Sequence, residues 1–183
     1  MKTFKYLLIF STAVSLLSTE SSAQTKPDDP AAKKDAGAPA AAPAAAPRKV
    51  EMGADISLDV AKKVAAAAAA EAKKNDWRLG IAIYDNAAHL VYFEKMDGAA
   101  PSVVDVANDK ARSAALFRRP TKAFMEGVEK EGRTGLLNLA NASPLQGGLP
   151  IMMDGKMVGS IGVSGSTGAQ DEQAAQAGLT AVK

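Results

Sequence analysis

The sequence predicts an α+β fold, in which an antiparallel sheet built from two hairpins is flanked by helices. Two pairs of β-rich segments, 79–84 with 89–95 and 149–153 with 156–163, are each joined by a short turn. Helix-forming segments lie before, between and after these pairs. The sequence lacks the alternating βαβ units that are typical of a doubly wound sheet. We therefore expect one antiparallel sheet with helices packed against it.

The first helix is predicted over residues 57–74. Ser57 can cap it, since a serine hydroxyl accepts hydrogen bonds from the backbone of the first turn. The alanine run 65–70 has high helix propensity. A face made of alanine allows such a helix to lie close to a sheet.

The first hairpin is predicted from two short strands around a polar turn. Ile81 and Ile83 share one face of the strand 79–84, the turn covers 85–88, and the strand 89–95 returns. This order requires the two strands to be antiparallel neighbours.

Two helices are predicted after this hairpin. Ser102 followed by Asp105 is a capping signature for a helix that extends to about Phe117. Pro120 ends it, since proline restricts the residue before it to non-helical backbone. Thr121 is expected to cap a second helix, which extends to about residue 131.

The second hairpin and a last helix complete the domain. Asp154-Gly155 between apolar segments is a strong hairpin signal. The last helix is predicted over 170–182, with Asp171 and Glu172 in its first turn, where acidic side chains suit the helix dipole.

Residues 1–23 have the features of a secretory signal peptide. A basic start precedes a short apolar run and small residues that end at Ala23. The apolar run is too short to span about 30 Å of hydrocarbon. We expect cleavage near Ala23, a periplasmic or secreted location and no stable membrane insertion.

Residues 24–53 form a Pro/Ala-rich segment that we expect to be a disordered linker, and residues 54–183 form one domain. A proline-rich recognition peptide is the alternative interpretation of the linker. The chain carries a net charge of +2, and the first two segments each carry +1, so the domain is neutral. A neutral domain lacks the basic surface that nucleic-acid binding requires.

The composition restricts the possible metal and haem sites. The chain has no cysteine, which excludes disulfides, thiolate ligands and covalent haem attachment. Its single histidine, His89, excludes a zinc site with several histidines; it is either structural or solvent-facing, or it serves as a base or a ligand. Glu126 and Glu129 share a helical face and are candidates for a hard cation or iron, with a solvated charged face as the alternative.

The glycine-rich stretch 159–168 does not match a nucleotide site. It lacks Gly-Lys-Ser/Thr, and its spacing differs from Gly-x-Gly-x-x-Gly. Gly159 and Gly162 lie within a predicted strand, where glycine marks a bulge or a close approach of another backbone.

Lys110 falls on the apolar face of its predicted helix, together with Ala107 and Ala114. A buried ammonium requires a partner or a displaced pKa. Asp85 and Asp97, at the two ends of the first hairpin, are the candidate partners. The alternative is that the side chain of Lys110 reaches water at the edge of the helix.

The junction between the two middle helices can hold a flat apolar molecule that carries carboxylates. Arg118 and Arg119 with Thr121 lie beside Phe117 and Phe124. Aromatic rings would contact the face of such a ligand, and guanidinium groups would bind its acids. A corner that only caps helices is the alternative.

Several ordered blocks resemble the HbpS/GlcG family of haem-binding proteins. The blocks are residues 85–91, 96–99, 110–121, 147–151, 154–155, 159–165 and 170–172. The resemblance covers about residues 55–183 and implies a profilin-like fold, assembly into homo-oligomers and non-covalent haem binding in some members. The sequence departs from the family at two turns. Asn86-Ala87-Ala88 stands in a turn that usually contains glycine, and Ser166 stands where glycine is common. These departures bring the geometry of the two turns into question.

The resemblance and the helix junction together give the candidate cofactor-binding residues. They are Met96, Asp97, Lys110, Phe117, Arg118, Pro120, Thr121 and Phe124. The first hypothesis is an exported haem-binding protein that handles haem or iron. The alternative is a module that binds a small organic acid or a corrinoid-type cofactor, with Lys110 and Asp97 in its pocket. Oxidative haem degradation is the enzymatic possibility, although the sequence offers no base–nucleophile pair.

Overall fold

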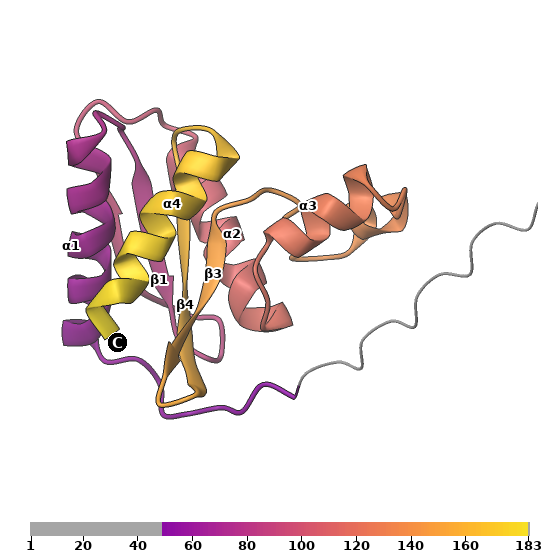
Figure 1. The fold of residues 1–183 in the computed structure, drawn as a ribbon, viewed down its shortest axis with the longest axis horizontal. Coiled ribbons are helices and arrows are strands. Elements are labelled where there is room, and N and C mark those ends of the chain that lie inside the picture. Colours follow the sequence, from indigo (N-terminus) through magenta and orange to yellow (C-terminus); the bar gives the residue numbers. More distant parts are fainter. Residues whose placement is uncertain (1–48, 183) are drawn as a thin grey trace, which may run out of the picture. The chain divides into compact units, whose positions relative to one another are not determined.

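Residues 49–182, which the computed structural model describes, contain a four-stranded antiparallel sheet with helices on both faces (Figure 1). The strands are β1 (Gly80–Tyr84), β2 (Leu90–Lys95), β3 (Gly148–Met153) and β4 (Lys156–Ser164), in the spatial order β2-β1-β4-β3. Each hairpin pairs its own strands, and β1 and β4 join the hairpins at the centre. The predicted α+β fold is confirmed. The predicted signal peptide and most of the predicted linker lie outside the described residues.

Helices α1 (Leu58–Lys74) and α4 (Gly168–Leu179) cover one face of the sheet, and α2 (Val103–Phe117) covers the other (Figure 1). The alternation of side chains along β1 produces the two layers. Ile81 and Ile83 pack with the alanines of α1 and α4, whereas Ala82 and Tyr84 pack with the alanines of α2. The sheet therefore separates two apolar cores.

Helix α2 lies backbone to backbone against β4. A Cβ atom added to Gly162 would collide with the carbonyl oxygen of Ala107 and the amide nitrogen of Ala111. Two positions earlier, on the same face of β4, the hydroxyl of Ser160 donates a hydrogen bond to the Ala111 carbonyl at 2.7 Å. The predicted close approach at Gly162 is confirmed.

The helix starts agree only partly with the capping predictions. Ser57 caps α1 as expected, since its hydroxyl accepts from the Val60 amide at 3.3 Å. Ser102 precedes α2 but makes no capping hydrogen bond through its side chain, so that prediction is wrong. Helix α4 begins earlier than predicted because Thr167 and Gln170 form a capping box. A short 3₁₀ turn, η2 (Thr180–Val182), follows α4.

Helix α2 ends at Phe117 as predicted, but the immediate cause is Arg118, which adopts a left-handed backbone with φ 51°. Helix α3 (Lys122–Glu129) follows and is shorter than predicted, and the 3₁₀ helix η1 (Thr134–Asn138) comes next. These two helices project from the sheet beside β3 (Figure 1). We refer to residues 118–147, which contain both, as the arm.

The first hairpin turn keeps its left-handed position without a glycine. Ala88 adopts φ 62°, and the side chain of Asp85 accepts hydrogen bonds from the amides of Ala87 and His89 at 2.9 and 2.8 Å. The carboxylate of Asp85 thus holds the turn in place of glycine.

Candidate functional site

The structure distributes the predicted site residues over three places. Lys110 and Thr121 are buried in a polar network where α2, the arm, β4 and α4 meet. The junction of α2 and α3 carries four of the others: Phe117, Arg118, Pro120 and Phe124. Met96 and Asp97 line a separate cavity at the end of β2.

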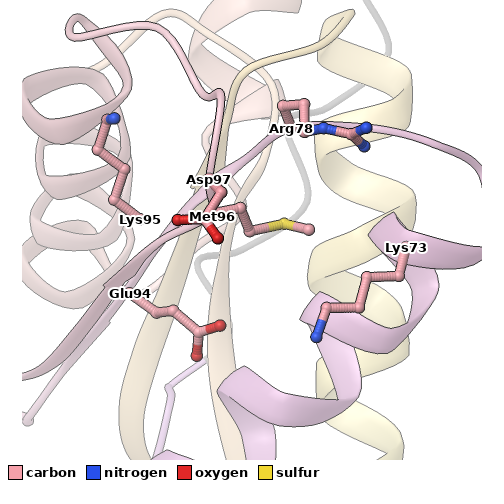
Figure 2. Close-up of a pocket in the computed structure, with 6 residues that line it drawn as sticks. All are labelled: Lys73, Arg78, Glu94, Lys95, Met96 and Asp97. Atoms are coloured by element: carbon pink, nitrogen blue, oxygen red, sulfur yellow. The ribbon is translucent and has the colours of Figure 1, made fainter.

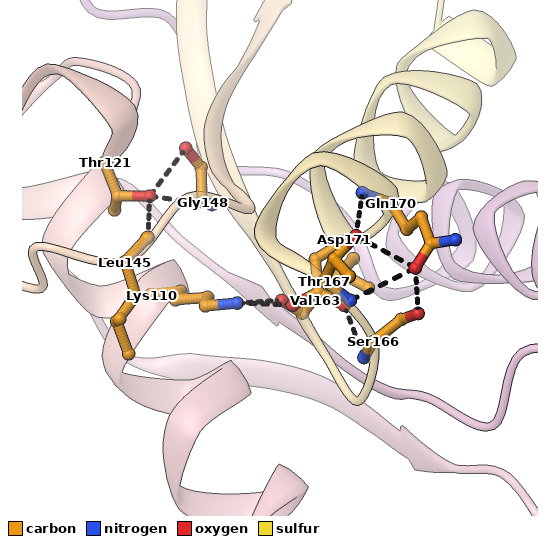
Figure 3. Close-up of polar contacts among 9 residues, drawn as sticks. All are labelled: Lys110, Thr121, Leu145, Gly148, Val163, Ser166, Thr167, Gln170 and Asp171. Atoms are coloured by element: carbon orange, nitrogen blue, oxygen red, sulfur yellow. Dashed lines mark hydrogen bonds and ion pairs between the residues drawn. The ribbon is translucent and has the colours of Figure 1, made fainter. Parts of the chain in front are cut away.

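Lys110 is buried, with 3 % of its side chain exposed. Its Nζ lies 2.7 Å from Oδ2 of Asp171 and donates to the carbonyl of Val163 at 2.9 Å (Figure 3). Of the two interpretations that the sequence left open, the structure shows the buried lysine, but both candidate partners, Asp85 and Asp97, are wrong. The alternative in which Lys110 reaches water is wrong, because its side chain is almost fully enclosed and its ammonium binds Asp171 and the carbonyl of Val163.

Asp171 completes this network from the first turn of α4. Its Oδ1 accepts a hydrogen bond from the Ser166 amide at 2.9 Å. Burial raises the pKa of the Asp171 carboxyl, and the ammonium of Lys110 and the Ser166 amide act in the opposite direction. Lys110 and Asp171 bind each other and the backbone, so the pair stabilises the fold at the end of β4.

Thr121 is fully buried and fastens the base of the arm. Its hydroxyl donates to the Leu145 carbonyl at 2.6 Å and accepts from the Gly148 amide at 2.9 Å (Figure 3). The predicted cap of α3 is wrong, because the side chain makes no hydrogen bond to that helix. In this structure the hydroxyl lies among backbone groups and away from solvent.

The junction of α2 and α3 brings together two exposed guanidinium groups, the half-buried ring of Phe117 and the buried ring of Phe124. The rings of Phe117 and Phe124 meet edge to face, with centroids 5.0 Å apart and an interplanar angle of 71°. The Cζ of Arg119 lies 5.2 Å from the centroid of Phe124. Arg118 and Arg119 are exposed, and neither forms an ion pair with any residue of the described chain. We refer to Phe117, Arg118, Arg119 and Phe124 as the aromatic–arginine corner.

Exposed leucines extend the apolar surface of the arm, and the sequence analysis missed them. They are Leu137, Leu139 and Leu145 in the arm and Leu116 at the end of α2. Exposed apolar side chains mark a binding surface when they form a large contiguous patch, so these leucines are candidates for one. Three of the four lie in the arm, outside any long helix or strand, where no periodic pattern pointed to them.

The cavity at the end of β2 has a volume of about 470 Å³ and a charged lining (Figure 2). It is lined by Lys73, Arg78, Glu94, Lys95, Met96 and Asp97. Lys110 is not among these residues, so the pocket that we expected Lys110 and Asp97 to share is not formed. The sequence analysis missed Lys73 and Arg78, which come from α1 and from the segment before β1.

The candidate metal ligands do not come together. Oε1 of Glu126 lies 2.8 Å from Nζ of Lys130, and this hydrogen bond lowers the pKa of Glu126. Glu129 is exposed on the same helix, and His89 is exposed near Asp85. Within residues 49–182 no group of three or more histidine or acidic side chains is arranged to hold a metal ion. The geometry at Glu126 fits the alternative of a solvated charged face.

Within the same residues, no helix combines the length and the apolar character needed to cross a bilayer.

Comparison with known proteins identifies relatives of the domain. Residues 56–180 match the family described as "Haem degrading protein HbpS-like". The protein GlcG of Escherichia coli K12 is 43 % identical over 94 residues, which are 51 % of this chain and 69 % of GlcG. An uncharacterised 15.0 kDa protein of Citrobacter freundii is 31 % identical over 101 residues, which are 54 % of this chain and 71 % of that protein.

Solved structures show the same fold. A double mutant of HbpS from Streptomyces reticuli is 32 % identical, with a TM-score of 0.66 over 79 % of this chain and 99 % of HbpS. The protein ORFY of Klebsiella pneumoniae is 26 % identical, with a TM-score of 0.66 over 75 % of this chain and 97 % of ORFY. The family match covers more than half of the chain, and these structures agree with it over the whole sheet. The chain therefore belongs to the HbpS-like family, to which the GlcG proteins are related.

Proposed function

We propose that this chain is an exported haem-binding protein that handles haem or iron outside the cytoplasm, and that haem binds at the aromatic–arginine corner. The family match supports a function related to haem. One observation carries the choice of site. The edge-to-face rings of Phe117 and Phe124 lie beside Arg118 and Arg119, and neither arginine forms an ion pair in the described part of the chain.

The chemistry of haem fits this corner. The macrocycle is flat and apolar, so Phe117 and the exposed leucines of the arm can cover part of one face. Its two propionates are carboxylates, and guanidinium groups bind carboxylates through paired, charge-assisted hydrogen bonds. Arg118 and Arg119 would bind these propionates, and the half-buried ring of Phe117 would contact the macrocycle, supported from behind by the buried ring of Phe124.

The corner is an open surface, and one copy of the chain would leave much of a bound macrocycle in water. A second copy packed against the arm would cover the other face, which accords with the homo-oligomer that the resemblance implies. Bound haem is non-covalent in this proposal, because the chain has no cysteine. Thr121 would act indirectly, by fastening the arm that carries the corner.

Export is part of the proposal. Residues 1–23 supply the signal, and residues 24–53 supply a tether between the export site and the domain. Mass spectrometry of the protein recovered from the periplasm or the medium tests this directly. A mature N-terminus near Gln24 is expected, and a chain that retains residues 1–23 in the cytoplasm would contradict export.

A hemin titration of the mature chain, followed by the Soret band, tests haem binding. We expect saturable binding, and we expect the double change Arg118→Ala and Arg119→Ala to weaken it by at least about tenfold, which corresponds to about 1.4 kcal/mol. Arg133→Ala is the matched control, because Arg133 is an exposed arginine of the same arm that pairs with Glu131. The absence of a Soret shift, or an equal loss of hemin affinity in the Arg133→Ala control, would contradict the proposed site.

A further inference from the structure

We infer that the cavity at the end of β2 binds a small zwitterion of the amino-acid type. The cavity is separate from the aromatic–arginine corner and shares no residue with it. Its walls come from three places in the chain: Lys73 in the last turn of α1, Arg78 in the segment before β1, and residues 94–97 at the end of β2. Its volume of about 470 Å³ lies in the range of small-molecule sites.

The charges of the lining are separated by sign. In Figure 2, Lys73 and Arg78 lie on one side, the carboxylates of Glu94 and Asp97 lie on the other, and the side chain of Met96 extends between them. Lys95 also lines the cavity, but in the same view its ammonium points away from Met96. The cavity therefore has a cationic wall and an anionic wall.

These charged groups are largely uncompensated by other side chains. Among residues 49–182, neither Lys73 nor Asp97 forms an ion pair. Arg78 uses one guanidinium nitrogen to bind the exposed Asp76 at 2.7 Å and has further donors available. One oxygen of Glu94 accepts from the hydroxyl of Tyr92 at 3.2 Å, which leaves the other oxygen for a ligand.

A ligand with both charges suits this arrangement better than a ligand with one. A lone carboxylate beside Lys73 and Arg78 would be repelled by Glu94 and Asp97, and a lone amine would be repelled by the cations. An amino acid places a carboxylate and an ammonium on one carbon, so both charges can be matched at once.

Met96 supplies the apolar contact for the rest of the ligand. It packs with the core and is 8 % exposed, so the ligand would meet only the part of its thioether that faces the cavity, and a small side chain suffices for that contact. A neutral amino acid with an aliphatic side chain is therefore the chemical class that the cavity fits.

Isothermal titration calorimetry of the mature chain with three matched probes tests the inference. The probes are L-leucine, 4-methylpentanoate, which lacks the ammonium, and 3-methylbutylamine, which lacks the carboxylate. We expect L-leucine to bind with a millimolar or lower Kd and each of the other two to bind at least about tenfold more weakly. Equal binding of the three probes, or no heat with L-leucine at millimolar concentration, would overturn it.

Two variants and one control locate the site. Lys73→Met and Glu94→Gln each remove a charge from one wall and are expected to weaken L-leucine binding about fivefold to tenfold. Lys62→Met removes an exposed lysine from the same helix without touching the cavity and should leave the affinity unchanged. If both cavity variants keep the affinity of the unmodified chain, L-leucine binds elsewhere and the assignment is wrong. Neither variant changes the aromatic–arginine corner, and far-ultraviolet circular dichroism checks that each variant is folded.

Discussion

Nζ of Lys110 lies 2.7 Å from Oδ2 of Asp171, and this contact joins helices that lie on opposite faces of the sheet. Lys110 comes from α2 and Asp171 from α4, and each side chain is 3 % exposed. The carbonyl of Val163, near the end of β4, accepts a hydrogen bond from the same ammonium. The two apolar cores are thus joined by one buried ion pair where the strand ends.

Loss of the lysine should be costly because it leaves a buried carboxylate without its partner. We expect Lys110→Met to lower the free energy of unfolding by roughly 3–5 kcal/mol at neutral pH, measured by urea denaturation. The additional change Asp171→Asn should recover part of this loss, because it removes the uncompensated charge. Lys130→Met, in an exposed pair with Glu126, is the control and should change stability very little. A Lys110→Met chain as stable as its parent would contradict the structural role of the pair.

The hydroxyl of Thr121 should matter more than its methyl group. Thr121→Val keeps the shape but leaves the Gly148 amide and the Leu145 carbonyl without their partner, and it is expected to cost about 1–3 kcal/mol. Thr121→Ser keeps the hydroxyl and should cost less. Thermal unfolding followed by circular dichroism compares the two. Equal midpoints for both variants would show that the hydrogen bonds contribute little.

The close seating of α2 on β4 predicts strong sensitivity at Gly162. Gly162→Ala forces the helix away from the strand and is expected to destabilise the domain by about 1–3 kcal/mol or more. Gly135→Ala is the matched control, since a Cβ there meets no atom within 4 Å. Urea unfolding of the two variants should separate them clearly, and similar midpoints would mean that the helix can shift without cost.

Glu71 links α1 to α4 and should make stability depend on pH. The side chains of Gln173 and Asn75 donate to its Oε1 at 2.7 and 3.0 Å, and these hydrogen bonds lower the pKa of Glu71 below its ordinary value. The folded pKa is then below the unfolded one, so the stabilisation is complete above the unfolded pKa of about 4.3 and is lost as the pH falls through the lowered value.

Glu71→Gln removes the titrating group and should therefore flatten the acidic part of the stability profile. Thermal midpoints measured from neutral pH down to about pH 3 test this against Glu129→Gln, an exposed change on α3. Parallel profiles for the parent chain and Glu71→Gln would refute the contribution of Glu71.

The hairpins were predictable because the residues of their turns have strong backbone preferences of their own. The polar network around Lys110 was not, because its contacts join residues that are far apart in the sequence. Asp154-Gly155 determines a turn through its own backbone preferences, and the turn appears where expected. Helical periodicity also placed Lys110 on the apolar face of its helix, but it did not decide between burial and contact with water. Its partner could not be inferred, because Asp171 is 61 residues away and its position in the first turn of a helix already had a local explanation.

Thr121 shows the same limit at shorter range. A threonine before a helix is expected to cap it, but two backbone groups at the end of the arm compete for the same hydroxyl and win. The charged cavity was missed for a related reason: Lys73 and Arg78 belong to different elements, and only the packing of α1 against the sheet brings them to Met96.

The hydrogen bonds of Thr121 also bear on how the chain tolerates insertions and deletions. Because one hydroxyl joins position 121 to positions 145 and 148, the segment between them is a closed loop whose two ends are held together independently of its contents. The entropy of closing such a loop grows only slowly with its length. We therefore expect the mostly exposed residues 129–141 to accept segments of other lengths and sequences without a change in strand register, whereas Phe124 and Ser143 pack or hydrogen-bond against α2 and have to stay.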